Sequence, residues 1–239
     1  MKNNIDLSII IPAYNEEDRI SLSLDTIYEY FDEKSVKYEV ILVDDGSRDE
    51  TVRVSQKSDL ARSGKLRVIS NERNRGKGFS VKTGILSSIG EYVLFTDADL
   101  STPISEFEKL YLEVGRGYDV VMASRSIEGS VLTVSQPWYR QTMGRIFNLF
   151  VKILFFKKYN DTQCGFKLFS GDVARAIAGK MTIDGFCFDV EMLYLAQKMG
   201  CRIKEIGVIW KNSPESKVTI LNSSFSMFID LFRIKKCHG

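Results

Sequence analysis

Short apolar runs rich in β-branched residues alternate with helix-like segments through the first half of this 239-residue chain. The segment at 16–31, between the first two runs, places apolar residues at the spacing of one helix face. Continuous apolar strands that alternate with helices form a parallel sheet covered on both faces. We therefore predict an α/β fold, with strands at residues 7–12, 38–45, 66–70, 92–99 and 119–124.

The composition favours one domain with a sizeable core, since 44% of the residues are hydrophobic. The formal charge of +2 gives no case for nucleic acid, because a polyanion requires positive charge concentrated on one face. The four widely spaced cysteines contain no C-x-x-C pair, which argues against a zinc cage or a disulfide framework. No run is long enough for a transmembrane helix, so we expect a protein that is cytosolic or bound to a membrane from the cytosol.

Polar segments follow four of the predicted strands at the point where each strand ends. In an open parallel sheet, ligands bind in the crevice beyond the carboxyl ends of the strands. The four segments should therefore line one site. They are PAYNEE (12–17), DDGSRDET (44–51), NERNRGKG (71–78) and DADLSTP (97–103).

Two aspartates, Asp97 and Asp99, follow the fourth predicted strand. Side chains at positions i and i+2 of a strand point to the same side, so the two carboxylates can approach one point if the chain stays extended. A divalent cation would relieve their repulsion, and Mg2+ or Mn2+ would accept phosphate oxygens as further ligands. The alternatives are that Asp99 caps the following helix, or that both aspartates are solvated loop residues. Their place after a buried strand favours a site shared by a metal and a diphosphate.

Five segments together resemble the family-2 glycosyltransferases of the GT-A fold, and in particular the members that transfer a sugar to a polyprenyl phosphate. That fold is a Rossmann-like, mostly parallel sheet with helices on both faces. The resemblance implies an inverting transfer of a hexose, most of all glucose, from a UDP-sugar to a dolichyl-type phosphate at the cytosolic membrane face. A GDP-mannose-dependent mannosyltransferase and an enzyme that adds sugar to a glycan hydroxyl stay open as alternatives. The segments are 8–20, 40–51, 74–78, 95–103 and 161–169.

The resemblance also implies roles for single residues at the first four strand ends. Asp45 would hydrogen-bond the uracil ring, although a structural turn and helix cap is the alternative for this segment. Asp97 would contact the ribose or the metal. The implied donor-binding residues are Pro12, Ala13, Tyr14, Glu16, Asp45, Gly76, Lys77, Asp97 and Asp99. The implied ligands of Mg2+ or Mn2+ are Asp97, Asp99 and, as a weaker ligand, Ser101.

The acceptor side of the implied site contains basic and acidic candidates. Arg125 and Lys167 would bind phosphate, and a guanidinium group suits phosphate oxygens because it donates two parallel hydrogen bonds. Without the resemblance, Arg125 would be interpreted as a surface arginine. Asp189 and Glu191 stand near the place where other family members hold a general base. They could act as a base, orient a sugar or a basic residue, or simply favour a helix N-terminus. An ionised phosphate acceptor needs no base. The catalytic candidates are Asp99, Arg125, Asp189 and Glu191.

The resemblance divides the single expected domain, 1–239, into functional parts. We expect a nucleotide-sugar-binding half, an acceptor-binding half and an apolar-basic tail. Their residues are 7–125, 126–211 and 212–239.

An apolar segment with cationic flanks, 145–156, is a candidate membrane contact. As a helix it would span about 18 Å, well short of the roughly 30 Å hydrocarbon core. It should therefore lie on the bilayer or inside the protein. A buried core helix is the alternative, but the flanks favour a helix on an anionic membrane surface, with Phe147 and Phe155 in the lipid. The segment 225–236 has a similar character and would provide a second contact.

Overall fold

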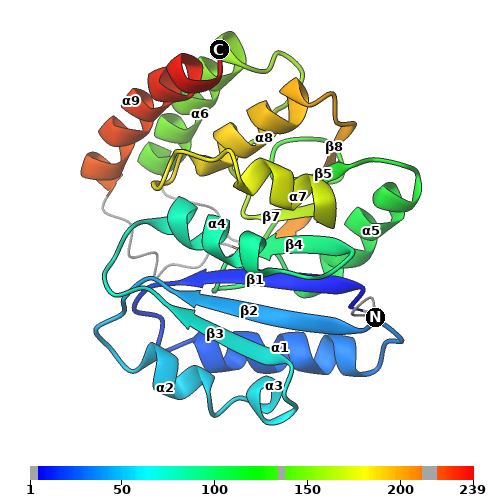
Figure 1. Ribbon diagram of the computed structural model, residues 1–239. Coiled ribbons are helices and arrows are strands. Elements are labelled where there is room, and N and C mark those ends of the chain that lie inside the picture. The colour runs from blue at the N-terminus through cyan, green and yellow to red at the C-terminus, as the bar shows by residue number, and fades with distance from the viewer. Residues whose placement is uncertain (1–4, 134–137, 212–219) are drawn as a thin grey trace.

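The computed structural model describes residues 5–133, 138–211 and 220–239, and in them it confirms the predicted α/β fold with a mostly parallel sheet (Figure 1). The described residues form a main sheet of seven strands and a small parallel sheet of two. The main sheet contains, in chain order, β1 (Leu7–Ala13), β2 (Tyr38–Asp44), β3 (Leu66–Ser70), β4 (Tyr92–Thr96), β5 (Val120–Ser124), β7 (Phe166–Ser170) and β8 (Ile203–Gly207). The small sheet contains β6 (Val131–Leu132) and β9 (Ile209–Trp210).

The main sheet has the strand order β3-β2-β1-β4-β7-β5-β8. Strands β1 to β4 pair in parallel, and so do β5 and β8. Strand β7 lies antiparallel between β4 and β5, an insertion that the sequence analysis did not predict. One sheet therefore runs through both proposed halves of the domain, and β7 brings a segment from late in the chain beside the end of β4. The proposed division into halves stays a prediction, and the first tail residues, 212–219, lie outside the described residues.

The predicted strand at 92–99 is too long. Strand β4 ends at Thr96, and the backbone N–H of Leu100 donates to the carbonyl of Asp97 at 3.2 Å. Leu100 has φ +46°, in the left-handed region, which confirms that the chain turns here rather than stays extended. The two aspartates therefore lie in a turn, and the i, i+2 rule for strands does not apply to them.

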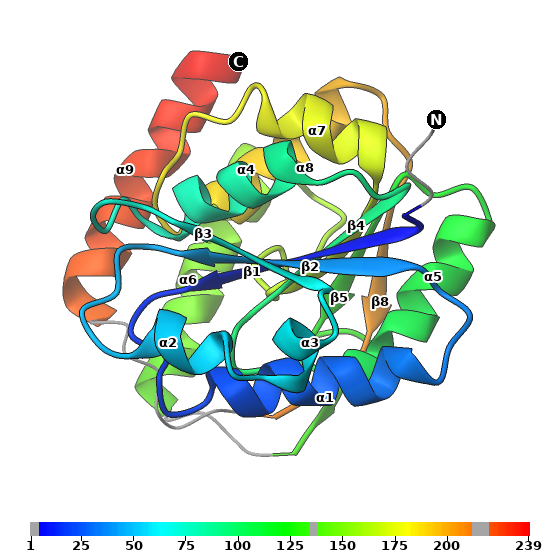
Figure 2. The same ribbon diagram turned by 60° about the horizontal axis from the view of Figure 1, so that its bottom comes forward.

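Helices cover both faces of the sheet (Figure 2). The predicted helix at 16–31 is confirmed as α1, which buries Ile20, Leu24, Ile27 and Phe31. One face carries α1 (Ile20–Asp32), α2 (Thr51–Ser55), α3 (Asp59–Arg62), the 3-10 helix η1 (Ile104–Glu106) and α5 (Phe107–Gly115). The other face carries α4 (Lys77–Ser87), α7 (Gly171–Ala178) and α8 (Phe188–Lys198).

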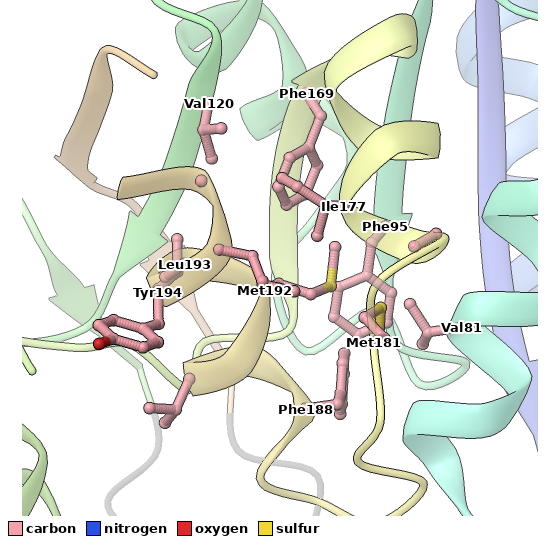
Figure 3. Packing of buried hydrophobic residues seen from close by; sticks show 14 of the residues in the cluster. Val81, Phe95, Val120, Phe169, Ile177, Met181, Phe188, Met192, Leu193 and Tyr194 are labelled. Carbon is pink, nitrogen blue, oxygen red and sulfur yellow. The ribbon is translucent and has the colours of Figure 1, made fainter. Parts of the chain in front are cut away.

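Helix α8 is enclosed by other elements, since every residue from Phe188 to Ala196 is buried. Phe188 packs edge-to-face on Phe95 of β4, with the ring centroids 5.4 Å apart (Figure 3). Met192 and Leu193 belong to the same apolar cluster. A helix that is buried all round must also place its acidic residues inside the protein. The two carboxylates of α8 therefore need partners in the interior.

Two further helices, α6 (Trp138–Leu154) and α9 (Ile220–His238), lie together at the end of the sheet toward which β1 and β2 point (Figure 2). The ring of Phe228 in α9 contacts Phe147 and Phe150 of α6, at centroid distances of 5.5 and 5.2 Å. None of the helices in the described residues is both long enough and apolar enough to cross a membrane. Both predicted membrane segments are helical, although α6 ends at Leu154 and not at residue 156, and their position on a membrane stays a prediction.

Candidate active site

Lys77 and Asp97 form the ion pair at the centre of the candidate donor site. The Nζ atom of Lys77, the first residue of α4, lies 2.5 Å from Oδ1 of Asp97, just beyond β4. Burial lowers the pKa of Lys77, but the carboxylates of Asp97 and Asp189 outweigh it and leave this pKa raised. Lys77 is therefore protonated at neutral pH. Both side chains are partly exposed, so a ligand can reach them.

Gly165 fixes the place of the Asp97 carboxylate. A Cβ atom at Gly165 would overlap both carboxylate oxygens of Asp97. Gly165 comes immediately before β7, the strand inserted beside β4. The close approach therefore requires glycine, a role that sequence reasoning missed although this residue lies in one of the five matching segments.

Asp99 caps the turn and leaves one oxygen available. Its Oδ1 accepts a hydrogen bond from the backbone N–H of Ser101 at 2.9 Å, whereas Oδ2 accepts none from the described residues. The described part of the chain contains no group of three or more His, Cys, Asp or Glu that could hold a metal by itself. Mg2+ commonly uses one or two carboxylates and takes its remaining ligands from water and phosphate. Oδ2 of Asp99 is therefore open to a cation that takes its other ligands from water and a bound diphosphate. The Asp97 carboxylate pairs with Lys77 and the Ser101 side chain is largely buried, so the set of metal ligands stays a prediction.

Asp45 holds the loop that leads into α4. Its carboxylate accepts hydrogen bonds from the backbone N–H groups of Arg75 and Gly76, at 3.0 and 2.8 Å, and from the side chain of Asn71 at 2.8 Å. Gly76 has φ +108°, which favours glycine. The position of Lys77 therefore depends on a buried carboxylate at the end of β2. The uracil contact of Asp45 stays a prediction.

The segment after β1 forms one wall with the segment after β2. The hydroxyl of Ser47 accepts from the backbone N–H of Asn15 at 2.9 Å, and that of Thr51 accepts from Glu16 at 2.7 Å. The structural turn expected for 44–51 is present, because the backbone N–H of Ser47 donates to the carboxylate of Asp44 at 3.3 Å. The expected helix cap is not, because α2 follows Glu50, whose side chain makes no capping hydrogen bond. Glu16 also pairs with Arg19, so its carboxylate faces a neighbour in the turn just before α1. Of the remaining donor-binding candidates, Pro12 and Ala13 are buried and Tyr14 is exposed.

Arg125 is held by a buried partner that the sequence analysis did not single out. Its Nε and Nη2 donate to the two carboxylate oxygens of Asp161, at 2.7 and 2.9 Å, and its backbone N–H also donates to Asp161. Burial lowers the pKa of Arg125, but Asp161 outweighs it and raises this pKa. Glu205 in turn accepts from the backbone N–H of Asp161 at 2.8 Å. The surface-arginine alternative is therefore wrong, and the signal for Asp161 was its place at the start of the segment 161–169.

Lys167 is not placed as a phosphate ligand in this structure. It is fully buried, and its amine donates to Asp189 and, at 2.5 Å, to the carbonyl of Cys164. Burial raises the pKa of Asp189 more than Lys167 lowers it. Of the three alternatives for Asp189, its contacts support the one in which it orients a basic residue.

Glu191 is anchored inside the protein, which corrects its place among the catalytic candidates. Its carboxylate is fully buried and accepts from the backbone N–H groups of Thr182 and Ile183, at 2.8 and 3.0 Å. The ring of His238 in α9 lies 2.8 Å from the same carboxylate. A carboxylate with this many partners inside the protein has no access to a substrate proton. The sequence pattern of α8 could not predict this role, because the partner His238 lies far along the chain.

These side chains form a cluster of opposite charges beside the carboxyl ends of β4 and β5 and the amino end of the antiparallel strand β7. Asp97 interacts electrostatically with Lys77, Arg125 and Asp189. Lys77 and Arg125 are the partly exposed cations of this group, while Lys167 is enclosed below them. The arrangement can neutralise a diphosphate at an acidic turn and bind a second anion beside it.

Comparisons with known proteins show the family of the chain. Residues 8–177 match the family described as glycosyl transferase family 2. The chain is 39% identical to dolichyl-phosphate beta-glucosyltransferase from Dictyostelium discoideum, over 98% of this chain and 75% of the relative. It is 35% identical to the human enzyme of the same name, over 96% of this chain and 74% of the relative.

Solved structures support the fold. Glucosyl-3-phosphoglycerate synthase from Mycobacterium tuberculosis, in complex with UDP, superposes with a TM-score of 0.71 at 20% identity, over 99% of this chain and 81% of that one. Other complexes of that synthase contain UDP with Mn2+ or Mg2+. The described sheet is therefore of the GT-A type. This chain belongs to glycosyltransferase family 2, and the relatives that it matches over nearly its whole length are dolichyl-phosphate beta-glucosyltransferases.

Proposed function

We propose that the protein transfers glucose from UDP-glucose to a dolichyl-type polyprenyl phosphate at the cytosolic face of a membrane, with inversion at the anomeric carbon. One observation carries the choice of acceptor. The two candidate bases, Asp189 and Glu191, are both buried and already have partners. Asp189 accepts from Lys167, and Glu191 accepts from two backbone N–H groups. A phosphate acceptor is ionised at neutral pH and attacks without a base, whereas a sugar hydroxyl must lose a proton. This contrast favours lipid phosphate over a glycan hydroxyl.

The transfer requires alignment and charge neutralisation. An oxygen of the acceptor phosphate attacks the anomeric carbon opposite the diphosphate, the bond from that carbon to UDP breaks, and UDP leaves. Lys77 faces the charge that develops on the diphosphate, and Arg125, kept rigid by Asp161, orients the acceptor phosphate. Asp97 and Asp99 would hold Mg2+ or Mn2+, which supplies further positive charge at the leaving group.

A membrane contact is part of the proposal, because the acceptor is a lipid. The outward face of α6 exposes Ile146, Leu149, Phe150 and Ile153, which recur at helical spacing. Helix α9 adds the exposed Ile229 and Phe232, followed by a basic last turn. We call these six residues the α6/α9 face. It lies at the same end of the sheet as the candidate site, and an apolar face with basic neighbours suits an anionic bilayer surface.

Phe147 and Phe155, which the sequence analysis expected in the lipid, do not face outward. Phe147 is 5% exposed and packs on Phe228, and Phe155 packs on Tyr194 at a centroid distance of 5.0 Å. Both rings therefore point into the protein. The α6/α9 face replaces them as the candidate for contact with lipid.

Calorimetry with nucleotides tests the donor. UDP and GDP are titrated separately into the protein with Mg2+ present, and then into the Asp99→Asn variant. We expect UDP to bind at least tenfold more tightly than GDP and to lose most of its affinity in the variant, since the cation links diphosphate to protein. Tighter binding of GDP would instead support the mannosyltransferase alternative.

A further inference from the structure

Glu191 joins α8 to the loop just before it and to α9, which is distant in the chain. From α8 it accepts hydrogen bonds from both the backbone N–H and the hydroxyl of Thr182, and from the backbone N–H of Ile183. His238, close to the end of α9, reaches the same carboxylate at 2.8 Å. The Glu191 side chain is 0% exposed and that of His238 is 12% exposed. A buried carboxylate with four partners from two other segments holds those segments in one relative position.

The segment that Glu191 holds lies directly against the start of α4. A Cβ atom at Gly78 would overlap the carbonyl of Ile183, and one at Gly76 would overlap the carbonyl of Asp184. The backbone N–H of Phe79 donates to that second carbonyl at 3.2 Å. Backbone therefore packs on backbone here, with no flexible side chain between to absorb a movement. The first turn of α4 must follow any shift of residues 182–185.

Lys77 lies between these two glycines and forms the ion pair with Asp97. We propose that Glu191 is a positioning residue for the donor site, acting through residues 182–185 on the first turn of α4, and that His238 is the partner that completes its hydrogen bonds. The placement of helix α9 then sets the affinity for the nucleotide-sugar. This inference rests on the proposed use of a UDP-sugar.

Helix α9 carries both the Glu191–His238 contact and part of the α6/α9 face. Leu231 and Ile234 bury one face of α9 in the core, while Ile229 and Phe232 on the same helix belong to the α6/α9 face. In this proposal α9 contacts lipid on one side and contacts Glu191 through His238 on the other. A shift of α9 at the membrane can therefore move residues 182–185 and the first turn of α4. The structure thus connects the proposed bilayer contact with the proposed donor site through one hydrogen-bonded carboxylate.

The test compares substitutions at the two partners. Glu191→Gln keeps the shape but has only one acceptor oxygen, so at least one buried donor loses its partner. His238→Ala removes the contact, whereas His238→Gln retains an N–H donor of similar reach. Cys237→Ser, at the exposed neighbouring position, is the matched control. Each full-length variant is assayed for the KM of UDP-glucose, the KM of polyprenyl phosphate, UDP affinity by calorimetry, and thermal unfolding.

We expect Glu191→Gln and His238→Ala to raise the KM of UDP-glucose and weaken UDP binding about tenfold, or ~1.4 kcal/mol, with the acceptor KM unchanged. His238→Gln and Cys237→Ser should stay near the wild type. Equal effects of His238→Ala and His238→Gln, or parallel rises of both KM values, would overturn the positioning role. If Glu191→Gln does not fold, the His238 pair decides. A wild type that binds UDP but forms no lipid product contradicts the proposed function instead, and the UDP affinities of the variants still decide the positioning role.

Discussion

Lys77 and Asp97 make an ion pair across 20 residues of sequence, with Nζ and Oδ1 2.5 Å apart. The pair joins the N-terminus of α4 to the turn after β4, the two places where the proposed function puts a diphosphate and a cation. Positive charge at a helix N-terminus adds to the attraction that the helix itself exerts on a phosphate.

Removal of the metal should abolish turnover. EDTA should reduce product formation to background and added Mg2+ or Mn2+ should restore it, because two carboxylates alone repel a diphosphate. Asp99→Asn should lower kcat at least about 100-fold, or ~2.7 kcal/mol, with little change in thermal unfolding, since Asp99 is partly exposed. Full activity in EDTA would contradict this prediction.

Gly165→Ala should damage the site more than the fold. The new methyl group would displace the Asp97 carboxylate, so kcat should fall at least about tenfold while the unfolding temperature changes little. Gly115→Ala is the control, because a Cβ atom there meets nothing within 4 Å. The measurement is turnover together with thermal unfolding for both variants. Equal activity of the two variants would show that the close approach of Gly165 to Asp97 does not affect turnover.

Asp161 should contribute to stability in a pH-dependent way. Burial raises the pKa of its carboxyl group, but Arg125 outweighs it and holds this pKa below the ordinary value of 3.8. The unfolded chain therefore binds the proton first, so the contribution of Asp161 is present above that value and is lost as the pH falls through the folded pKa.

The Asp161→Asn variant tests this dependence. It should lose about 1–3 kcal/mol of stability at pH 7, because the guanidinium group of the partly exposed Arg125 loses its charged acceptor. The difference between wild type and variant should shrink from pH 5 to pH 2 in urea unfolding. A difference that stays constant over this range would show that folding does not shift the pKa of Asp161.

The α6/α9 face should bind anionic vesicles. The wild type should sediment with vesicles that contain phosphatidylserine, less so at high salt, and Leu149→Glu combined with Ile153→Glu should release it while UDP binding is kept. Leu22→Glu combined with Leu112→Glu is the matched control, since these residues are exposed on α1 and α5. Release by the control pair as well, or by neither pair, would place the lipid contact elsewhere.

The sequence patterns predicted much of the fold because its strands are short, apolar and separated by clear helices. They could not place β7 between β4 and β5, since an apolar run does not indicate which strands will flank it. The partly exposed residues of the site, such as Lys77 and Asp97, were predicted from motifs at strand ends. The roles of Asp161, Asp189 and Glu191 were not, because each depends on a partner that only the tertiary structure brings close.

Formation of a lipid-linked sugar tests the central claim most directly. The protein is incubated with Mg2+, radiolabelled UDP-glucose and either a short polyprenyl phosphate or the matching polyprenol, with maltose as a hydroxyl acceptor in a third reaction. The account predicts labelled lipid only with the phosphate, and no labelled sugar product from maltose. Label in the maltose product, or equal label with polyprenol, would contradict it.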